Sequence, residues 1–383
     1  MPSGRFSFPT LIHFGPGVRA KVAGFLKDKG LQRPLLVSDK GLAALPVFTE
    51  VFQSLKTGGL EPGTFSGIWG NPTKTQVAAG VEAYRAHRAD CLVGLGGGAA
   101  LDVSKAIALM VNHPGDLFDY EDEKPGALPF KYEIPFWVAL PTTSGTGSEV
   151  GRSSVISDDQ THLKKIIFDP KLLARAVFAD PELTLGLPGP VTAATGMDAL
   201  THCVEAYLAK DYHPICDGVA LEGLRLASQS LAQCVEKPGD IEARGSMMMA
   251  SMMGAIAFQK GLGLVHSSAH ALSTFKDLHH GLANGIMIDH ALPFNVSAVP
   301  ERFRSLAQAA GLKDESPEAF ITWLTSLKKR IGIPAGLSEK GIQAGDVKRL
   351  SELAFQDSCH LNNPRPCTQA DFEVIFLKAI KAL

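Results

Sequence analysis

The first half of the chain alternates short apolar runs with segments of helical periodicity. Apolar runs at Pro34–Asp39, Cys91–Leu95 and Trp137–Leu140 have the length of strands. The run at Cys91–Leu95 is apolar throughout, which is typical of a strand buried on both faces. Between the first two runs, Lys74–His87 places apolar residues at helical spacing. Strands that alternate with helices predict a parallel sheet with helices on both faces.

The pattern changes near Pro188, and strand-like runs nearly vanish beyond it. Helical periodicity there predicts four helices, at Ala193–Ala209, Asp217–Val235, Ile241–Phe258 and Glu318–Ile331. We therefore expect an α/β domain over residues 1–187 and an all-helical domain over residues 188–383.

The composition narrows the class of protein. The chain has 383 residues, of which 45% are hydrophobic and 20% charged, so it can bury a large core. Its net charge of -2 argues against nucleic-acid binding through bulk positive charge. The longest apolar stretch is too short to cross a bilayer, and the first residues lack the layout of a signal peptide. Six cysteines without CxxC spacing are typical of free thiols. We expect a cytoplasmic protein that binds neither nucleic acid nor membrane.

A glycine loop follows the strand that ends at Leu95. It reads Gly96-Gly97-Gly98-Ala99, and a helix is expected to begin near Asp102. Glycines let the backbone pass close to an anion, and the start of a helix directs N–H groups and a positive dipole end towards it. A plain strand-to-helix turn is the alternative. The spacing matches neither the G-x-G-x-x-G fingerprint nor a P-loop.

A second loop, Pro141–Glu149, is rich in hydroxyl side chains and contains two glycines. Both loops follow predicted parallel strands, where open α/β sheets bind ligands. Asp39 ends an earlier strand. A carboxylate there accepts hydrogen bonds from the ribose of an adenine nucleotide and repels a 2′-phosphate. The alternative is an aspartate that only forms the turn before Lys40.

Acidic and histidine side chains recur at helical spacing in the second half. Asp198 and His202 are four residues apart, His266 and His270 repeat that spacing, and His280 follows. Residues four apart share a helix face, and one Asp with several His suits a divalent metal such as Fe²⁺ or Zn²⁺. Each histidine alone is more typical of a structural residue, but the set favours a metal. Spacing does not identify which three histidines bind it.

In this order the motifs resemble those of the iron-containing (group III) alcohol dehydrogenases, over nearly the whole chain. The segments that carry the resemblance are Phe14–Gly17, Asn71–Thr73, Gly96–Lys105, Pro141–Glu149, Gly196–His202, Gly261–His270, His280-Gly281 and Asn363–Pro366. The resemblance implies a Rossmann-like NAD-binding domain in residues 1–187 and a helical metal-binding and substrate domain in residues 188–383. Ala99 stands where the family usually has serine.

The resemblance also implies roles for individual residues. The metal, Fe²⁺ or Zn²⁺, would be held by Asp198, His202, His266 and His280. His270 would lie beside the nicotinamide as the catalytic group that relays the proton. NAD would be bound by Asp39, Asn71, Gly97, Gly98, Ala99, Asp102, Thr142, Thr143, Thr146 and Lys164.

We therefore predict an NAD-linked alcohol dehydrogenase that acts on a primary alcohol, as a homodimer or larger homo-oligomer. Short phrases around Gly261 and His280 resemble the 4-hydroxybutyrate dehydrogenase branch in particular. Lys260 is a candidate to pair with an anionic end of such a substrate. Its alternative is a solvated lysine at a helix end.

Two other functions are open at this point. A lyase similar to dehydroquinate synthase would need several basic residues in its cleft, for which Arg152, Lys164 and Lys260 are the candidates. A non-catalytic sensor of metal and nucleotide would have no need of His270 as a proton relay.

Overall fold

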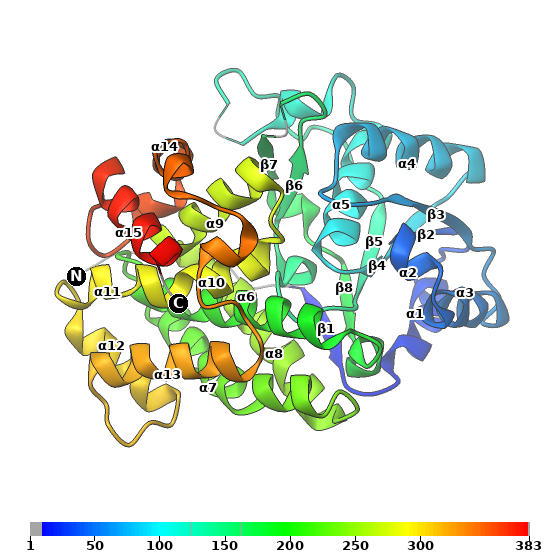
Figure 1. Cartoon of the computed structure of the whole chain (residues 1–383). Coiled ribbons are helices and arrows are strands. Elements are labelled where there is room, and N and C mark those ends of the chain that lie inside the picture. Colours follow the sequence, from blue (N-terminus) through cyan, green and yellow to red (C-terminus); the bar gives the residue numbers. More distant parts are fainter. Residues whose placement is uncertain (1–9, 123, 162, 382–383) are drawn as a thin grey trace. The chain divides into compact units, whose positions relative to one another are not determined.

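The computed structural model describes residues 10–122, 124–161 and 163–381 (Figure 1). These residues form two compact units. We call the first the sheet unit; of the described residues it contains 10–143 and Ser148–Thr184. We call the second the helical unit; it contains Ser144–Gly147 and the chain from Leu185 onwards. The expected boundary lies after residue 187, and the membership of Ser144–Gly147 in the helical unit was not anticipated.

A six-stranded sheet forms the centre of the sheet unit. Its strands are β1 (Leu11–Phe14), β2 (Pro34–Asp39), β3 (Gly63–Ile68), β4 (Cys91–Gly96), β5 (Phe136–Pro141) and β8 (Ala176–Ala179). They lie in the order β1-β8-β5-β4-β2-β3, and every neighbouring pair is parallel. The predicted parallel sheet is thus confirmed, and the three predicted strands are β2, β4 and β5.

Helices cover both faces of this sheet. They are α1 (Val22–Asp28), α2 (Lys40–Ala43), α3 (Pro46–Thr57), α4 (Lys74–His87) and α5 (Gly98–Asn112). Leu26 of α1 and Leu55 of α3 belong to one apolar cluster with Val93 of β4. The next residue of β4, Gly94, points to the opposite face. A β-carbon there would lie 3.2 Å from Leu101 and 2.8 Å from Ser104, so α5 packs directly on that face.

An antiparallel hairpin and short 3-10 helices complete the sheet unit. The hairpin pairs β6 (Ser153–Ser157) with β7 (Lys164–Phe168). The 3-10 helices are η1 (Val18–Lys21), η2 (Leu117–Tyr120), η3 (Ser148–Val150), η4 (Pro170–Leu172) and η5 (Pro181–Thr184).

The described residues of the helical unit form helices and contain no strand. The α-helices are α6 (Gly189–Leu208), α7 (Pro214–Glu236), α8 (Ile241–Ala257), α9 (Leu264–Lys276), α10 (His280–Ala291), α11 (Pro293–Val296), α12 (Pro300–Ala309), α13 (Pro317–Arg330), α14 (Val347–Gln356) and α15 (Gln369–Lys381). The 3-10 helices are η6 (Phe258–Lys260), η7 (Leu337–Lys340), η8 (Ala344–Asp346) and η9 (Cys359–Asn362). The four predicted helices correspond to α6, α7, α8 and α13.

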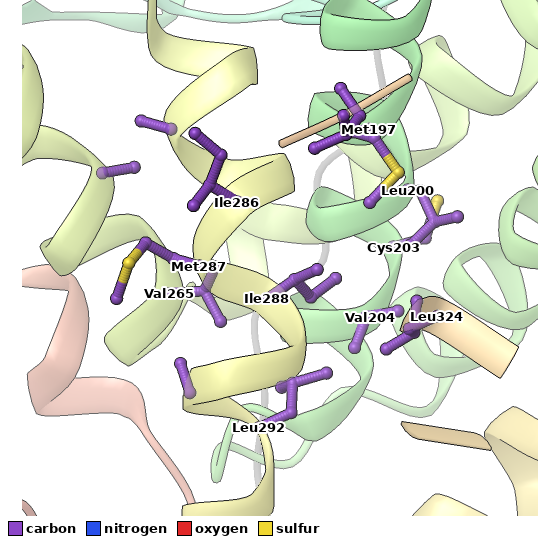
Figure 2. Close-up of a cluster of buried hydrophobic side chains, with 14 of the residues drawn as sticks. Met197, Leu200, Cys203, Val204, Val265, Ile286, Met287, Ile288, Leu292 and Leu324 are labelled. Carbon is purple, nitrogen blue, oxygen red and sulfur yellow. The ribbon is translucent and has the colours of Figure 1, made fainter. Parts of the chain in front are cut away.

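The core of the helical unit lies around α6 and α10. Figure 2 shows Met197 and Leu200 of α6 together with Ile286 and Ile288 of α10, and all four are fully buried. At the start of α10, a β-carbon on Gly281 would come within 2.4 Å of a backbone oxygen of α6. Glycine is therefore needed for this close approach, which brings the first turn of α10 against the middle of α6.

No single helix of the described chain has the length and hydropathy to span a membrane. One bent pair, Ile241–Lys260 with Leu264–Lys276, meets both criteria when its two parts are taken together.

Candidate functional site

The glycine loop joins β4 directly to α5. Gly96 has a φ of +153°, and a β-carbon there would lie 2.6 Å from that of Ala100. Gly97 is the N-cap of α5 and Gly98 is its first residue, and no side chain caps this helix. Within the described chain no side chain caps the first N–H groups of α5, which makes them candidates to bind an anion.

The threonines after β5 lie beside this loop. Because β4 pairs with β5, the N–H of Thr142 donates to the carbonyl of Gly96 at 3.1 Å. A β-carbon on Gly97 would lie 3.1 Å from the methyl group of Thr143. The two loops of small residues in the sheet unit therefore lie side by side, at the carboxyl ends of adjacent parallel strands.

Asp39 lies next to the same loop and also caps a helix. Its Oδ1 accepts a hydrogen bond from the N–H of Leu42 at 2.8 Å, at the start of α2. A β-carbon on Gly96 would lie 3.6 Å from its Oδ2. Asp39 thus forms the turn considered above, and its second oxygen faces the glycine loop.

Asp102 holds α5 in place. Its carboxylate accepts hydrogen bonds from Ser148 Oγ at 2.6 Å, the N–H of Val155 at 3.1 Å and Lys105 Nζ at 3.4 Å. Burial lowers the pKa of Lys105, although Asp102 counteracts this effect. The bonds of Asp102 thus tie α5 to η3 and β6, and its role in NAD binding stays a prediction.

The remaining residues predicted to bind NAD are more widely placed. Ala99 is the second residue of α5. Asn71 and Lys164 are both linked to Ser157 of β6. The N–H of Ser157 donates to the carbonyl of Pro72, the residue after Asn71, and Ser157 pairs in register with Lys164 of β7. Thr146 belongs instead to the helical unit, within Ser144–Gly147.

The helical unit brings together the four side chains predicted to bind the metal. Asp198 and His202 are one turn apart on α6, His266 lies in the first turn of α9, and His280 begins α10. One candidate ligand atom from each lies within 4.8 Å of all the others. Asp198 Oδ1 is 3.4 Å from His280 Nε2, 3.9 Å from His266 Nε2 and 4.0 Å from His202 Nε2. The carboxylate oxygen is thus the point on which the three rings converge.

The electrostatics of this cluster suit a divalent cation. Burial lowers the pKa of His202 to about 4, aided by the nearby His266, while Asp198 acts in the opposite direction. At neutral pH the His202 ring is therefore uncharged and presents a lone pair. Asp198 supplies the one negative charge of the set, and its side chain is 2% exposed. Imidazole nitrogens with one carboxylate are a donor set for Fe²⁺ or Zn²⁺.

Asn284, one turn after His280 on α10, lies among these donors. Its Nδ2 donates to Asp198 Oδ1 at 2.8 Å and is 3.2 Å from Nε2 of both His266 and His280. Its Oδ1 is buried and has no hydrogen-bond partner among the described residues. A buried polar atom without a partner costs free energy. The excess of buried acceptors here fits a site built around a cation.

Glu205 is a further residue of this site that the sequence analysis missed. Its Oε2 accepts a hydrogen bond from His266 Nδ1 at 2.7 Å, and its side chain is 2% exposed. Glu205 follows His202 by three residues and Asp198 by seven, so all three lie on one face of α6. That spacing was the signal available in the sequence.

His270 has a different environment from the candidate ligands. Its Nδ1 donates to Asp357 Oδ2 at 2.7 Å, and its ring stacks on that of His280 with the centroids 5.1 Å apart. The His270 side chain is 28% exposed. It is therefore adjacent to the metal cluster, open to solvent on one side, and oriented by a carboxylate.

A second group of candidate metal donors consists of His270, Asp357 and Cys359. Burial and the charge of Asp357 raise the pKa of the Cys359 thiol well above its ordinary value. A neutral thiol is a weak ligand, because metals bind the thiolate. The group around Asp198 is the better metal site.

Lys260 is buried and paired with a carboxylate of the same unit. It is 3% exposed, and its Nζ donates to Asp217 Oδ1 at 2.5 Å and to the carbonyl of Tyr207 at 2.9 Å. Asp217 also pairs with Arg302 at 2.7 Å. The expectation that Lys260 binds an anionic substrate is therefore corrected: the helix end that carries it is buried, and the ammonium has its carboxylate within the protein.

This correction predicts the behaviour of Lys260→Met. The variant should lose about 1–3 kcal/mol of unfolding free energy, because it removes hydrogen bonds of a buried charged group. The ratio of kcat/KM for 4-hydroxybutyrate to that for butan-1-ol should not change. Denaturant unfolding and the two activity assays measure these quantities, with the exposed Lys210→Met as the control. A selective loss of hydroxy-acid oxidation would restore the original interpretation.

Two family models together cover most of the chain. Iron-containing alcohol dehydrogenase matches residues 9–181, and Fe-containing alcohol dehydrogenase family, C-terminal, matches residues 192–380. The 4-hydroxybutyrate dehydrogenase of Cupriavidus necator is 37% identical over 373 residues, which cover 95% of this chain and 96% of that protein.

Two solved structures are similar in fold and in length. A crystal structure of 1,3-propanediol oxidoreductase has a TM-score of 0.94 and 34% identity, and the match covers 98% of this chain and 100% of the other. The sulfoacetaldehyde reductase of Bifidobacterium kashiwanohense, solved in complex with NAD⁺, has a TM-score of 0.91 and 28% identity, with 99% of each chain covered. These matches confirm the resemblance read from the motifs: the chain belongs to the iron-containing alcohol dehydrogenase family.

Proposed function

We propose that this chain interconverts primary alcohols and aldehydes by hydride transfer to and from NAD, at a divalent metal held by Asp198, His202, His266 and His280. The observation that carries the proposal is the convergence of one carboxylate and three imidazole nitrogens within 4.8 Å, beside a partly exposed His270. The family assignment and the NAD⁺ complex of a similar protein support the same chemistry.

The side chains have distinct tasks in this reaction. When bound, the cation acts as a Lewis acid that lowers the pKa of the alcohol hydroxyl and polarises the aldehyde carbonyl. Asp198 offsets part of the positive charge of the cation, so the site is milder than one made of histidines alone. His270 holds its Nδ1–H on Asp357, which leaves Nε2 to take the hydroxyl proton and pass it to solvent.

The glycine loop is our candidate for the pyrophosphate site of NAD. Gly97, Gly98 and Ala99 present the uncapped start of α5, and a β-carbon on Gly96 or Gly97 would crowd Ala100 or Thr143 beside it. Thr142 and Thr143 would lie along the cofactor, and Asp39 Oδ2 would accept from the adenine ribose.

The substrate class that we propose is short primary alcohols, including diols and ω-hydroxy acids. The names of two similar proteins, 1,3-propanediol oxidoreductase and 4-hydroxybutyrate dehydrogenase, support it. Lys260 has no part in this proposal. The lyase and sensor alternatives are not favoured, since Lys260 is paired with Asp217 and His270 is oriented as a proton relay needs.

The test uses protein stripped of metal and reloaded with Fe²⁺ or Zn²⁺. Each form is incubated with NAD and butan-1-ol, propane-1,3-diol or 4-hydroxybutyrate, and NADH absorbance is followed. We expect oxidation only with metal. Zinc should bind more tightly by the general order of affinities, while iron should give the higher rate. Absence of NADH with every alcohol and both metals would refute the proposal.

The charge of Asp39 predicts a preference for NAD over NADP, because the carboxylate would face the 2′-phosphate. Asp39→Asn keeps a good N-cap for α2 without the charge, and Asp39→Gly removes the side chain with little loss of capping. In both variants the ratio of kcat/KM for NAD to kcat/KM for NADP should fall towards one. Equal kcat/KM values in the wild-type enzyme would contradict this role.

A cytoplasmic location and a homodimeric or larger assembly are part of the same proposal. Both are expected from the sequence and are to be tested by fractionation and by sedimentation.

A further inference from the structure

Helix α9 carries two histidines in matching surroundings. His266 and His270 lie one turn apart, and each points its Nδ1 at a carboxylate oxygen 2.7 Å away. The carboxylates come from different elements, Glu205 from α6 and Asp357 from the segment after α14. Both histidines are thus fixed at the same ring nitrogen but by separate partners.

The surroundings of Glu205 fix the tautomer of His266. Glu205 Oε1 accepts the N–H of Val265 at 2.7 Å, and Oε2 accepts the N–H groups of Gly263 and His266, each at 3.1 Å. Both carboxylate oxygens are therefore acceptors, so His266 Nδ1 must be the donor. His266 Nε2 then presents its lone pair, 3.9 Å from Asp198 Oδ1.

Glu205 also ties this ring to the backbone. Its three backbone donors form the start of α9, where a negative charge is stabilised by the exposed N–H groups. One buried carboxylate of α6 thus sets both the position of α9 and the rotation of His266. The same helix α6 provides two of the candidate metal ligands, Asp198 and His202.

Asp357 performs the corresponding task one turn further along. Its hydrogen bonds come from His270 Nδ1, from Ser267 Oγ at 2.7 Å and from the N–H of Cys359 at 2.9 Å. None of these three donors is one of the four candidate metal ligands of the described chain. Asp357 thus holds His270 at Nδ1 and leaves Nε2 as the nitrogen that does not face the carboxylate, while the His270 ring stacks on that of His280.

We propose that Glu205 and Asp357 are positioning residues that divide the two histidines of α9 between metal binding and proton transfer. Glu205 sets the affinity for the cation through His266, and Asp357 sets the rate of turnover through His270. The proposal rests on the proposed function, and it assigns separate measurable effects to two carboxylates that look alike.

The matched variants are Glu205→Gln and Asp357→Asn. In Glu205→Gln an amide NH₂ group replaces one of the two carboxylate oxygens. This NH₂ group must face either the N–H of Val265 or Nδ1 of His266, so one of these hydrogen bonds is lost or the His266 tautomer changes. In Asp357→Asn the same replacement lets the amide face His270 Nδ1 and favours the opposite tautomer, while Oδ1 still accepts from Ser267. Each variant is titrated with Co²⁺ against a competing chelator, with the visible absorption of the cobalt as the readout, and turnover is measured at saturating metal.

We expect Glu205→Gln to weaken Co²⁺ binding about 10–100-fold, as loss of a hydrogen-bond partner behind a metal ligand does. Asp357→Asn should bind Co²⁺ as the wild-type protein does but lose at least about 10²-fold in kcat. At saturating metal, Glu205→Gln should recover most of its turnover. Equal loss of affinity in both variants, or in neither, would overturn the division of roles.

Folding is controlled by thermal melting of the metal-free proteins. If Glu205→Gln does not fold, Glu205→Asp carries the test, because it keeps the charge but shortens the reach to His266. Its Co²⁺ affinity should then fall below that of the wild-type protein, and wild-type affinity would overturn the role of Glu205. If the wild-type protein binds Co²⁺ but oxidises no alcohol with any metal, the proposed function fails while the affinity comparison still decides the role of Glu205.

Discussion

Replacement of Asp198 with alanine should remove both the metal and all measurable alcohol oxidation. Asp198 Oδ1 is the atom on which the three histidine nitrogens converge, at 3.4–4.0 Å, and it carries the only charge among the four ligands. Three imidazoles alone would leave no negative charge among the ligands themselves to compensate a cation in a buried site. The measurement is metal content by mass spectrometry after gel filtration, together with NADH formation.

The control for this prediction is His290→Ala. His290 also lies on α10, but its Nε2 contacts the carbonyl of Ala335 and it is not one of the clustered donors. This control should retain its metal, and Asp198→Ala should still bind NAD, because the glycine loop belongs to the sheet unit. Wild-type metal content in Asp198→Ala would show that the ligand assignment is wrong.

Replacement of His270 with alanine should leave the metal in place and slow turnover by about 10²–10⁴-fold, the effect expected when a proton-transfer group is lost. His270 belongs to a different donor group from the four candidate ligands, so its removal should not empty the site. Metal content and kcat are measured on the same sample. His279→Asn is the control, since it alters the exposed N-cap of α10, where Asn is a favoured residue. Full activity in His270→Ala would make His270 a packing residue.

The sequence predicted those parts of the fold whose signal is local. β2, β4 and β5 lie inside the sheet and are almost entirely buried, so their sequences are nearly uninterrupted apolar runs. β1 is an edge strand with exposed residues at both ends, and β8 has four residues. Short strands of this kind lack a periodicity that separates them from loops. α9 and α10 were not predicted as helices, because their histidines and small residues interrupt the apolar pattern.

In the candidate site, too, the sequence predicted the local relations and missed the contacts between distant residues. The spacing of Asp198 and His202 is enough to indicate that both lie on one helix face. The partners of Asp357 lie 87 residues away for His270 and 90 for Ser267, so no periodic pattern relates them. Lys260 was misplaced for the same reason, since Asp217 lies 43 residues before it. Contacts of this range depend on how helices pack.

The four residues Ser144–Gly147 have a consequence for the order of folding during synthesis. A β-carbon on Gly145 would lie 2.9 Å from Thr195 of α6, and one on Gly147 would lie 2.2 Å from Ala255 of α8. The ribosome makes these partners only after the sheet unit is complete. A nascent chain that ends at Thr184 therefore contains every strand of the sheet but holds this segment without its partners, and a genetic cut at the boundary would separate them permanently. Within the described residues, the chain passes between the two units at three points rather than one, so no uninterrupted fragment contains all residues of one unit and none of the other.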